Sequence, residues 1–328
     1  MTWFDQLTGF RERSHDAVQS DLRLEEANLV SAANDRRFTY GEFTTPSLAE
    51  LRLNLESIGD QGMKIQQVVA DVTSIHQNPA NQDAVIQVAS QFNCLEMAAP
   101  HLTPEDGVGI YQNDWTQGPA CSICAGAGTI YRNYFVPCRG QIGQTSGNQI
   151  DCLHELGEAM GNQDNRLWSM QNGYCLPKAG SLQEIRAHIE AANEGELKKL
   201  HGLLRIGRQF RTEVTVGDSN HLVTQLFCSA LPVAYSRLSE ADWEPFAQLV
   251  LDAAYEATFL AALENARLTG CRKLYLTLLG GGAFGNRLEW ILAAIGRSAI
   301  LFSDSDLDVS IVSYRQSNPA IDALIQAL

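Results

Sequence analysis

A glycine-rich turn near the carboxyl end constrains the fold of this chain more than any other feature. In LTLLGGGAFGN, residues 276–286, an apolar segment runs directly into Gly280, Gly281, Gly282 and Gly285. A helical pattern follows, formed by Leu288, Ile291, Leu292 and Ile295. Glycines let backbone N–H groups approach an anion closely, and the next helix points its positive end at the same place. The turn therefore predicts a phosphate-binding loop. A tight turn without a ligand is the alternative, although four glycines in six residues exceed what such a turn needs.

The same turn fits the G-x-G-x-x-G fingerprint of dinucleotide-binding domains. If AILFSD is interpreted as a second strand, Asp304 lies where a ribose-binding carboxylate would be expected. A Rossmann domain needs several further strands, however, and only 24 residues follow Asp304. They suffice for one strand (VSIVSY) and one short helix (PAIDALIQAL). The position of the turn in the chain therefore excludes a Rossmann domain that begins there.

Composition limits the classes of partner. With 328 residues, 45% of them hydrophobic, the chain can form one large or two ordinary globular domains. A net charge of −14 repels nucleic-acid phosphate and favours a basic protein or an arginine-bearing substrate. No apolar run approaches the ~18 residues of a membrane span, and the start lacks the apolar core of a signal peptide. We expect a cytoplasmic monomer that binds neither membrane nor nucleic acid, with export as an effector left open.

The eight cysteines do not form a disulfide framework in a chain of this length. Cys121 and Cys124 form a CSIC motif that could bind a metal or perform redox chemistry. No second CxxC is present, and His154 is the only histidine nearby. Buried thiols are the commoner use of such residues, so we expect neither a metal nor a cofactor.

The chain alternates between strand and helix patterns from residue 64 onward. Strands are expected in IQQVVADV, AVIQVAS, GRQFRTEVTV and HLVTQLFCSALPVAY, and one helix is expected over 184–204. Ser239 and Asp242 cap a long helix that Gly270 closes. Residues 1–62 are interpreted as an accessory extension of helices and loops, in which Leu48, Leu51, Leu55 and Ile58 share one helix face. The Gly-, Gln- and Asn-rich stretch at 138–166 is interpreted as a surface insertion within residues 63–328.

The order of these segments resembles a macrodomain, the ADP-ribose-binding α/β/α module. VVADVTSIH is similar to the strand whose terminal aspartate, here Asp71, accepts from the adenine amino group. DAVIQVASQFN is similar to the strand that usually carries an asparagine pair. The resemblance implies a three-layer α/β/α fold with a mixed sheet and an N-terminal helical extension.

Longer segments resemble one group of macrodomain hydrolases, typified by the bacterial effector MavL. These are QFNCLEM, TPEDGVGIYQNDWTQGPA, YRNYF and VTQLFCSALPVAY. The resemblance implies removal of ADP-ribose from arginine side chains of proteins. GAFG also resembles the loop of poly-ADP-ribose glycohydrolases, but the GGG that is followed by a catalytic QEE triplet in those enzymes is absent, which argues against cleavage of the polymer.

The chain departs from the usual macrodomain where the asparagine pair should be. Gln87 and Ser90 occupy the two positions, so Asn93 is the candidate that could replace the amide near the distal ribose. The usual catalytic loop is replaced by TPEDGVGIYQNDWTQGP. We expect ligand contacts from Asp71, Val72, Thr116, Gln117, Gly280, Gly281, Gly282, Ala283, Phe284, Gly285 and Asn286.

Hydrolysis of an N-glycosidic bond requires a carboxylate that activates water or stabilises an oxocarbenium-like state. The candidates in the new loop are Asp114, preferred because it directly precedes a helix start, and then Glu105 and Asp106. Each could instead be structural: Asp114 as a helix cap, the other two as solvated turn residues. Two functions stay open, an ADP-ribosyl hydrolase acting on modified protein and a reader that binds ADP-ribose without turnover.

Overall fold

A seven-stranded mixed sheet organises the molecule. The computed structural model describes residues 1–54 and 62–328. The strand order is β4-β11-β12-β6-β13-β14-β5. Strands from β12 to β5 are parallel, whereas β11 is antiparallel to both β12 and β4. The bounds are Glu42–Thr44 (β4), Lys64–Val69 (β5), Val85–Ser90 (β6), Gly207–Glu213 (β11), Leu222–Ser229 (β12), Lys273–Leu276 (β13) and Asp308–Ser313 (β14).

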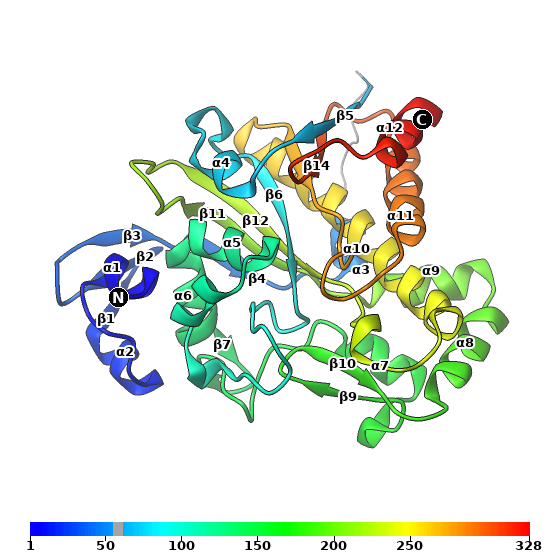
Figure 1. Cartoon of the computed structure of the whole chain (residues 1–328), viewed down its shortest axis with the longest axis horizontal. Coiled ribbons are helices and arrows are strands. Elements are labelled where there is room, and N and C mark those ends of the chain that lie inside the picture. The colour runs from blue at the N-terminus through cyan, green and yellow to red at the C-terminus, as the bar shows by residue number, and fades with distance from the viewer. Residues whose placement is uncertain (55–61) are drawn as a thin grey trace.

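Helices cover both faces of this sheet, as alternate residues of one strand show. In β12, the Thr224 hydroxyl donates to Asn265 of α10 (Glu240–Thr269), 2.9 Å away. The next residue, Gln225, donates to the Cys121 carbonyl of α5 (Gln117–Cys124) at 2.7 Å. Because successive side chains of a strand point to opposite faces, α10 and α5 lie on opposite sides. The predicted three-layer fold with a mixed sheet is confirmed (Figure 1).

The long helix α10 is the centre of one layer. Ser239 caps its start by accepting from the Asp242 amide, and left-handed Gly270 ends it, both as predicted. α11 (Leu288–Leu301), α8 (Ser181–Ala191) and α3 (Leu48–Leu53) pack against it. Within the described residues, α10 alone has the length and apolar composition of a membrane span, but 89% of its apolar window is buried in the protein. Its apolar character is that of a core helix.

The remaining helices complete the layers and connect them. They are α1 (Trp3–Thr8), α2 (His15–Asp21), α4 (Val72–Gln77), α6 (Gly126–Tyr134), α7 (His154–Met160), α9 (Glu194–Gly202) and α12 (Pro319–Ala327), with 3-10 turns η1 (Pro79–Asn81), η2 (Pro104–Asp106), η3 (Gly109–Asn113), η4 (Gln163–Asn165) and η5 (Val233–Tyr235). Two hairpins pair β7 (Pro137–Cys138) with β8 (Gln141–Ile142) and β9 (Trp168–Gln171) with β10 (Tyr174–Pro177).

The amino-terminal residues contain strands as well as the predicted helices. β1 (Leu22–Glu25), β2 (Asn28–Ser31) and β3 (Arg37–Thr39) form a small sheet beside α6, at the left of Figure 1. β4 extends the main sheet by pairing with β11. These strands have three or four residues each, too few for apolar alternation to reveal them. The interpretation of this segment as helices and loops only is therefore corrected.

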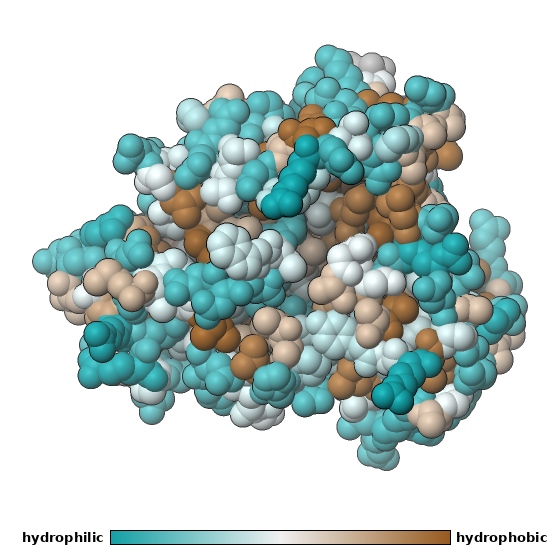
Figure 2. All heavy atoms as spheres, viewed as in Figure 1, coloured by the Kyte–Doolittle hydropathy of each residue, from teal (hydrophilic) through white to brown (hydrophobic). Residues whose placement is uncertain are grey.

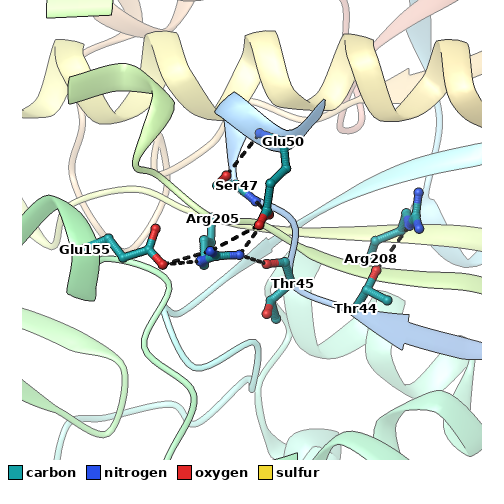
Figure 3. A network of polar contacts seen from close by, with 7 residues as sticks. All are labelled: Thr44, Thr45, Ser47, Glu50, Glu155, Arg205 and Arg208. Atoms are coloured by element: carbon teal, nitrogen blue, oxygen red, sulfur yellow. Dashed lines mark hydrogen bonds and ion pairs between the residues drawn. The ribbon is translucent and has the colours of Figure 1, made fainter. Parts of the chain in front are cut away.

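A partly exposed polar network attaches the α3 region to the body of the molecule (Figure 3). Ser47 and Glu50 form the predicted capping box of α3. Arg205 joins Glu50 at 3.0 Å to Glu155 of α7 at 2.8 Å and also donates to the Thr45 carbonyl. Leu48 and Leu51 are buried as predicted, whereas Leu55 and Ile58 lie outside the described residues.

Three further predictions need correction. The single helix expected over 184–204 is two helices, because Ala192 is extended and Asn193 caps a new start at α9. AILFSD is the end of α11 and a turn, not a strand, so Asp304 does not end a strand. The 138–166 segment is not only a surface insertion, since Cys152, Leu153 and Leu156 are buried in the main core.

Candidate functional site

A pocket opens where β6, β12 and β13 end. Its volume is about 150 Å3. Its lining combines the strand ends, the loop before α5 and the glycine-rich turn before α11: Ala89, Ser90, Gln91, Glu96, Met97, Ala98, Asp114, Thr116, Gln117, Gly118, Pro119, Tyr174, Cys228, Ala230, Tyr235, Thr277, Leu278, Gly280, Gly282, Ala283 and Phe284. The side of the molecule drawn in Figure 2 is hollowed near its middle, among hydrophilic and hydrophobic atoms. Ligands of parallel α/β sheets bind at this edge, outside the carboxyl ends of the strands.

Glu96 is the buried carboxyl group of the pocket. It follows β6 and is 2% exposed, and its Oε1 atom makes no hydrogen bond with the described residues. Burial raises the pKa of Glu96 well above its usual range, and the negative charge of Asp114 acts in the same direction. The positive charge of Arg132 opposes this shift but does not cancel it. Burial thus favours the protonated form of Glu96, the form that could donate a proton to a ligand.

Asp114 is the second carboxylate of the pocket. It ends η3, where its amide donates to the Tyr111 carbonyl at 3.1 Å. Its Oδ1 atom accepts from the Thr116 amide at 2.9 Å, which forms a short turn before α5. Asp114 is half-buried, with its side chain at the pocket. Thr116, not Asp114, is the cap residue of α5, so the Asp114 side chain shapes the turn before the helix and lies at the pocket.

The start of α5 packs closely against the end of β6 and the Glu96 side chain. A Cβ atom at Gly118 would lie 2.1 Å from the Ala89 carbonyl oxygen and 2.2 Å from Glu96 Oε2, so only glycine fits there. The Gln117 side chain bonds the backbone of β6, accepting from the Ala89 amide and donating to the Gln87 carbonyl. Gln117 lines the pocket, but both ends of its amide serve to hold α5 on the strand, and its predicted contact with a ligand stays a prediction.

The glycine-rich turn forms the opposite wall. Gly280 and Gly285 have φ of +72° and +71°, and added Cβ atoms would meet Ala230 at 2.5 Å and Ala234 at 2.8 Å. Within the described chain, the amides of Gly282, Ala283 and Phe284 donate to no protein acceptor. A Cβ at Gly282 would meet nothing within 4 Å. The turn thus presents free N–H groups beside open space, the arrangement that binds phosphate oxygens.

Other predicted residues of the turn support its shape. Asn286 is 4% exposed and donates to the Leu231 carbonyl at 2.8 Å, so it anchors the turn to the end of β12. Gly281 packs near Ile291 of α11. Phe284 is half-buried, and its ring contacts Tyr174 and Tyr235 with centroid distances of 5.3 and 5.7 Å. These three rings form the aromatic side of the pocket.

Several predicted residues lie outside the pocket lining. Asn93 is fully buried. Its side-chain NH2 group donates to the Gln149 side chain, and its side-chain oxygen accepts from the Leu95 backbone N–H. Glu105 accepts from Ser146, and Asp106 accepts from the Thr103 amide in the η2 turn. Asn93, Glu105 and Asp106 thus stabilise loops here. Sequence proximity suggested them, but their side chains are already bonded elsewhere.

Asp71 and Val72 lie at the same edge of the sheet as the pocket, but two strands beyond β13. Asp71 follows β5, is exposed, and caps α4 by accepting from the Thr73 amide at 2.7 Å. The Ala70 amide donates to the carbonyl of Ser313 at the end of β14, so exposed Tyr314 follows beside it. The structure therefore does not bring Asp71 into the pocket itself.

The CSIC cysteines are buried in α5. Desolvation raises the pKa of Cys124 to about 12, which keeps its thiol protonated at neutral pH. The parts of the chain described here contain no group of three or more His, Cys, Asp or Glu side chains suited to a metal ion.

Glu96 is the functional candidate that the sequence analysis missed. It lies in the quoted segment QFNCLEM, as a lone acidic residue among apolar neighbours. Charged residues are almost never fully buried without a reason, so an isolated glutamate in an apolar stretch just after a buried strand was the available signal.

Comparison with known proteins shows similarity in fold only. No protein-family model matches the chain, and no curated protein matches its sequence. The chain is similar to a poly(ADP-ribose) glycohydrolase from Thermomonospora curvata, with 14% identity, 95% of each chain covered and a TM-score of 0.47. It is also similar to the enzyme from Deinococcus radiodurans in complex with ADP-ribose, with 12% identity, 86% of this chain and 90% of that chain covered, and a TM-score of 0.45. Similarity at this level leaves function to be argued from the pocket.

Proposed function

We propose that this chain is an ADP-ribosyl hydrolase that releases ADP-ribose from modified protein side chains. The observation that supports this most is the pairing of two unlike carboxyl groups, Glu96 and Asp114, across from the free amides of residues 282–284. A diphosphate bound by those amides would leave the attached ribose near both carboxyl groups. Hydrolysis of a glycosidic bond uses such a pair, one group as proton donor and the other as base or charge stabiliser.

The proposed roles follow from the surroundings of each group. Glu96, whose pKa burial raises, donates a proton to the departing side chain. Asp114 activates the attacking water or stabilises the positive charge that develops at the anomeric carbon. In this step the bond from the anomeric carbon to the side chain breaks, and a bond to the water oxygen forms. The water loses one proton to Asp114.

We propose arginine as the modified residue. A guanidine, like the alkoxide of a serine, leaves its ribose as a strong base and gains from a proton donor, whereas a carboxylate released from an ester does not, so the donor sets arginine and serine apart from glutamate. The net charge of −14 also favours a substrate with positive charges around the modified site. The adenine is proposed to lie toward Asp71, at the same edge of the sheet, as the macrodomain resemblance implies.

The direct test measures release of ADP-ribose from proteins modified on arginine, glutamate or serine. We expect the wild-type chain to act on the arginine-linked substrate, and Asp114→Asn to reduce turnover by roughly 10²-fold or more while ADP-ribose still binds, as measured by isothermal titration. Asp218→Asn makes the same charge change at an exposed loop outside the pocket lining and is the control. Binding without release from any of the three substrates would favour the reader over the hydrolase.

A further inference from the structure

The amino-terminal residues make contacts that the proposed reaction does not explain. We propose that residues 2–12 are a positioning element of the pocket, in which the Glu12 carboxylate fixes the loop that carries Asp114 and, through Tyr111, the backbone of Glu96. This inference relies on the proposed function for its kinetic consequence. Its structural part stands on the contacts alone.

Glu12 lies between α1 and α2 and accepts three hydrogen bonds. The amides of Val108 and Gly109 donate to its two carboxylate oxygens at 2.8 and 2.7 Å, and the Tyr134 hydroxyl donates at 2.6 Å. Val108 and Gly109 form the start of η3, almost a hundred residues away in sequence. All three donors are neutral groups. The two carboxylate oxygens of Glu12 therefore bind by accepting hydrogen bonds and not by pairing with a cation. A glutamine cannot accept all three in the same way, because one of its two terminal atoms is a donor.

Two glycines make this approach possible. A Cβ atom at Gly107 would lie 2.6 Å from Glu12 Cδ, and one at Gly109 would lie 2.6 Å from Glu12 Oε2. Gly107 also has a φ of +83°, a conformation that favours glycine. The φ of Gly109 is not positive. Gly109 is therefore explained by the contact with Glu12 and not by its backbone conformation. The EDGVG part of the loop is shaped to receive this carboxylate.

Trp3 adds a second attachment on the same turn. Its indole N–H donates to the Val108 carbonyl at 3.0 Å, and its backbone N–H donates to the Oε1 atom of Gln112 at 3.1 Å. Val108 is thus held at both its N–H, by Glu12, and its C=O, by Trp3. The amino-terminal segment therefore forms hydrogen bonds with Gly109 and Gln112 of η3 and with Val108, the residue before η3.

The other end of η3 contacts both carboxyl residues of the pocket. The Tyr111 hydroxyl accepts from the Glu96 amide at 3.0 Å, and the Tyr111 carbonyl accepts from the Asp114 amide at 3.1 Å. Tyr111 is 1% exposed, so its ring cannot move without disturbing its neighbours. Loss of the Glu12 contact is therefore transmitted to Glu96 and Asp114 together. Glu12 touches neither carboxyl group and is a positioning residue.

Hydrogen exchange tests the structural part without a substrate. In Glu12→Gln, we expect amides in peptides covering 104–117 to exchange at least about tenfold faster than in the wild type, while peptides covering 273–313 keep their protection. Asp16→Asn, an exposed carboxylate in α2, is the matched control and leaves both regions unchanged. Unchanged exchange at 104–117 overturns the proposal. Faster exchange in both regions also does, because it would reflect a general loss of stability.

Kinetics on the arginine-linked substrate test the consequence for the pocket. Glu12→Gln should reduce kcat by roughly 10- to 100-fold, the scale of a misplaced catalytic group, while the Kd for ADP-ribose stays close to wild type. An unchanged kcat in the presence of faster exchange would overturn the positioning role. If the wild type releases no ADP-ribose from any substrate, the proposed function fails, and the exchange result still decides whether Glu12 holds the loop.

A second variant approaches the same contact from the loop. Gly109→Ala places a methyl group against Glu12 Oε2 and should reproduce the faster exchange of Glu12→Gln. In a Glu12→Ala background the nearest obstacle, Glu12 Oε2, is removed, and only Thr2 stays close to the methyl group, at 3.1 Å. The double variant should therefore exchange little faster than Glu12→Ala alone. Additive effects of the two substitutions would mean that Gly109 acts independently of Glu12, contrary to the proposal.

Discussion

At the scale of single residues, the pocket depends on a buried acid and a buried base that do not form an ion pair. Arg132 is fully buried, and its guanidinium donates to the Cys94 carbonyl and to Gln209, with the Phe227 ring 3.6 Å away. Burial lowers the pKa of Arg132 to about 10, so it stays charged at neutral pH. It bonds the backbone of Cys94, two residues before Glu96, while Glu96 itself lines the pocket.

The Glu96→Gln variant should be less active and more stable. A proton donor is lost, so we expect kcat to fall by roughly 10²- to 10⁴-fold. The raised pKa of Glu96 means that its carboxyl stabilises the fold most below about pH 4.5, and that this contribution is lost as pH rises through the folded-state pKa. Glutamine avoids the cost of burying a charge. The melting temperature of the variant relative to wild type should therefore rise as pH increases above about 4.5, and a falling difference would contradict the assignment.

The sequence placed some candidate residues near one another, but their contacts with a ligand stay predictions. Asp114, Thr116, Gly282 and Phe284 were all expected at the ligand, and all line one pocket. Asn93 was chosen by its distance in sequence from a missing asparagine, yet its side chain turns into the interior. Glu96 was overlooked because burial of a carboxyl group depends on α5 and β6 packing across it, and these elements are separate in sequence.

At the scale of elements, ligand binding by the glycine-rich turn can be tested with a substitution that should leave the fold intact. Gly282→Val adds a side chain where nothing lies within 4 Å and where φ is not positive, so the fold should tolerate it. The same side chain fills the space beside the free amides. We expect ADP-ribose to raise the melting temperature of wild type according to RT ln(1 + [L]/Kd), and the variant to show no such rise.

Gly147→Val is the control for this experiment. Gly147 is exposed, has open space around its Cβ position and also lacks a positive φ, but it lies outside the pocket lining. Its response to ADP-ribose should match wild type. If Gly282→Val responds as strongly as wild type, the ligand binds elsewhere than at this turn.

Long or strongly patterned elements were predictable from sequence, and short ones were not. β6 and α10 agree with their expected positions because the apolar pattern of the first is continuous and the caps of the second are explicit. β12 covers only the first part of the strand expected over 221–235, because Val233–Tyr235 is the 3-10 turn η5. The α8 and α9 pair was joined into one helix, since charged amphipathic residues continue across the Ala192 break. AILFSD has the composition of a strand but continues α11, where packing against α10 decides its conformation.

At the scale of the whole molecule, one buried glutamate connects three helices. Glu256 of α10 is 3% exposed and accepts from Arg52 of α3 at 2.6 Å and from Arg297 of α11 at 2.9 Å. Arg52 also donates to the Lys198 carbonyl in α9. These contacts attach the amino-terminal α3 to the layer that supports the glycine-rich turn, so the extension and the pocket domain are expected to unfold together.

Glu256→Gln should weaken the whole fold in a pH-dependent way. Burial alone would raise the pKa of Glu256, but hydrogen bonds from Arg52 and Arg297 lower it overall. A carboxyl group with a lowered folded-state pKa stabilises the fold above its unfolded value, about pH 4.5, and loses that contribution as pH falls through the folded value. At pH 7 the variant should lose roughly 1–3 kcal/mol of unfolding free energy in urea, with a single transition. Glu190→Gln breaks the exposed pair with Arg186 and should change stability little. The deficit of Glu256→Gln should shrink below about pH 4.5, and a deficit that is constant down to pH 3 would mean that packing, not the charge of Glu256, joins the helices.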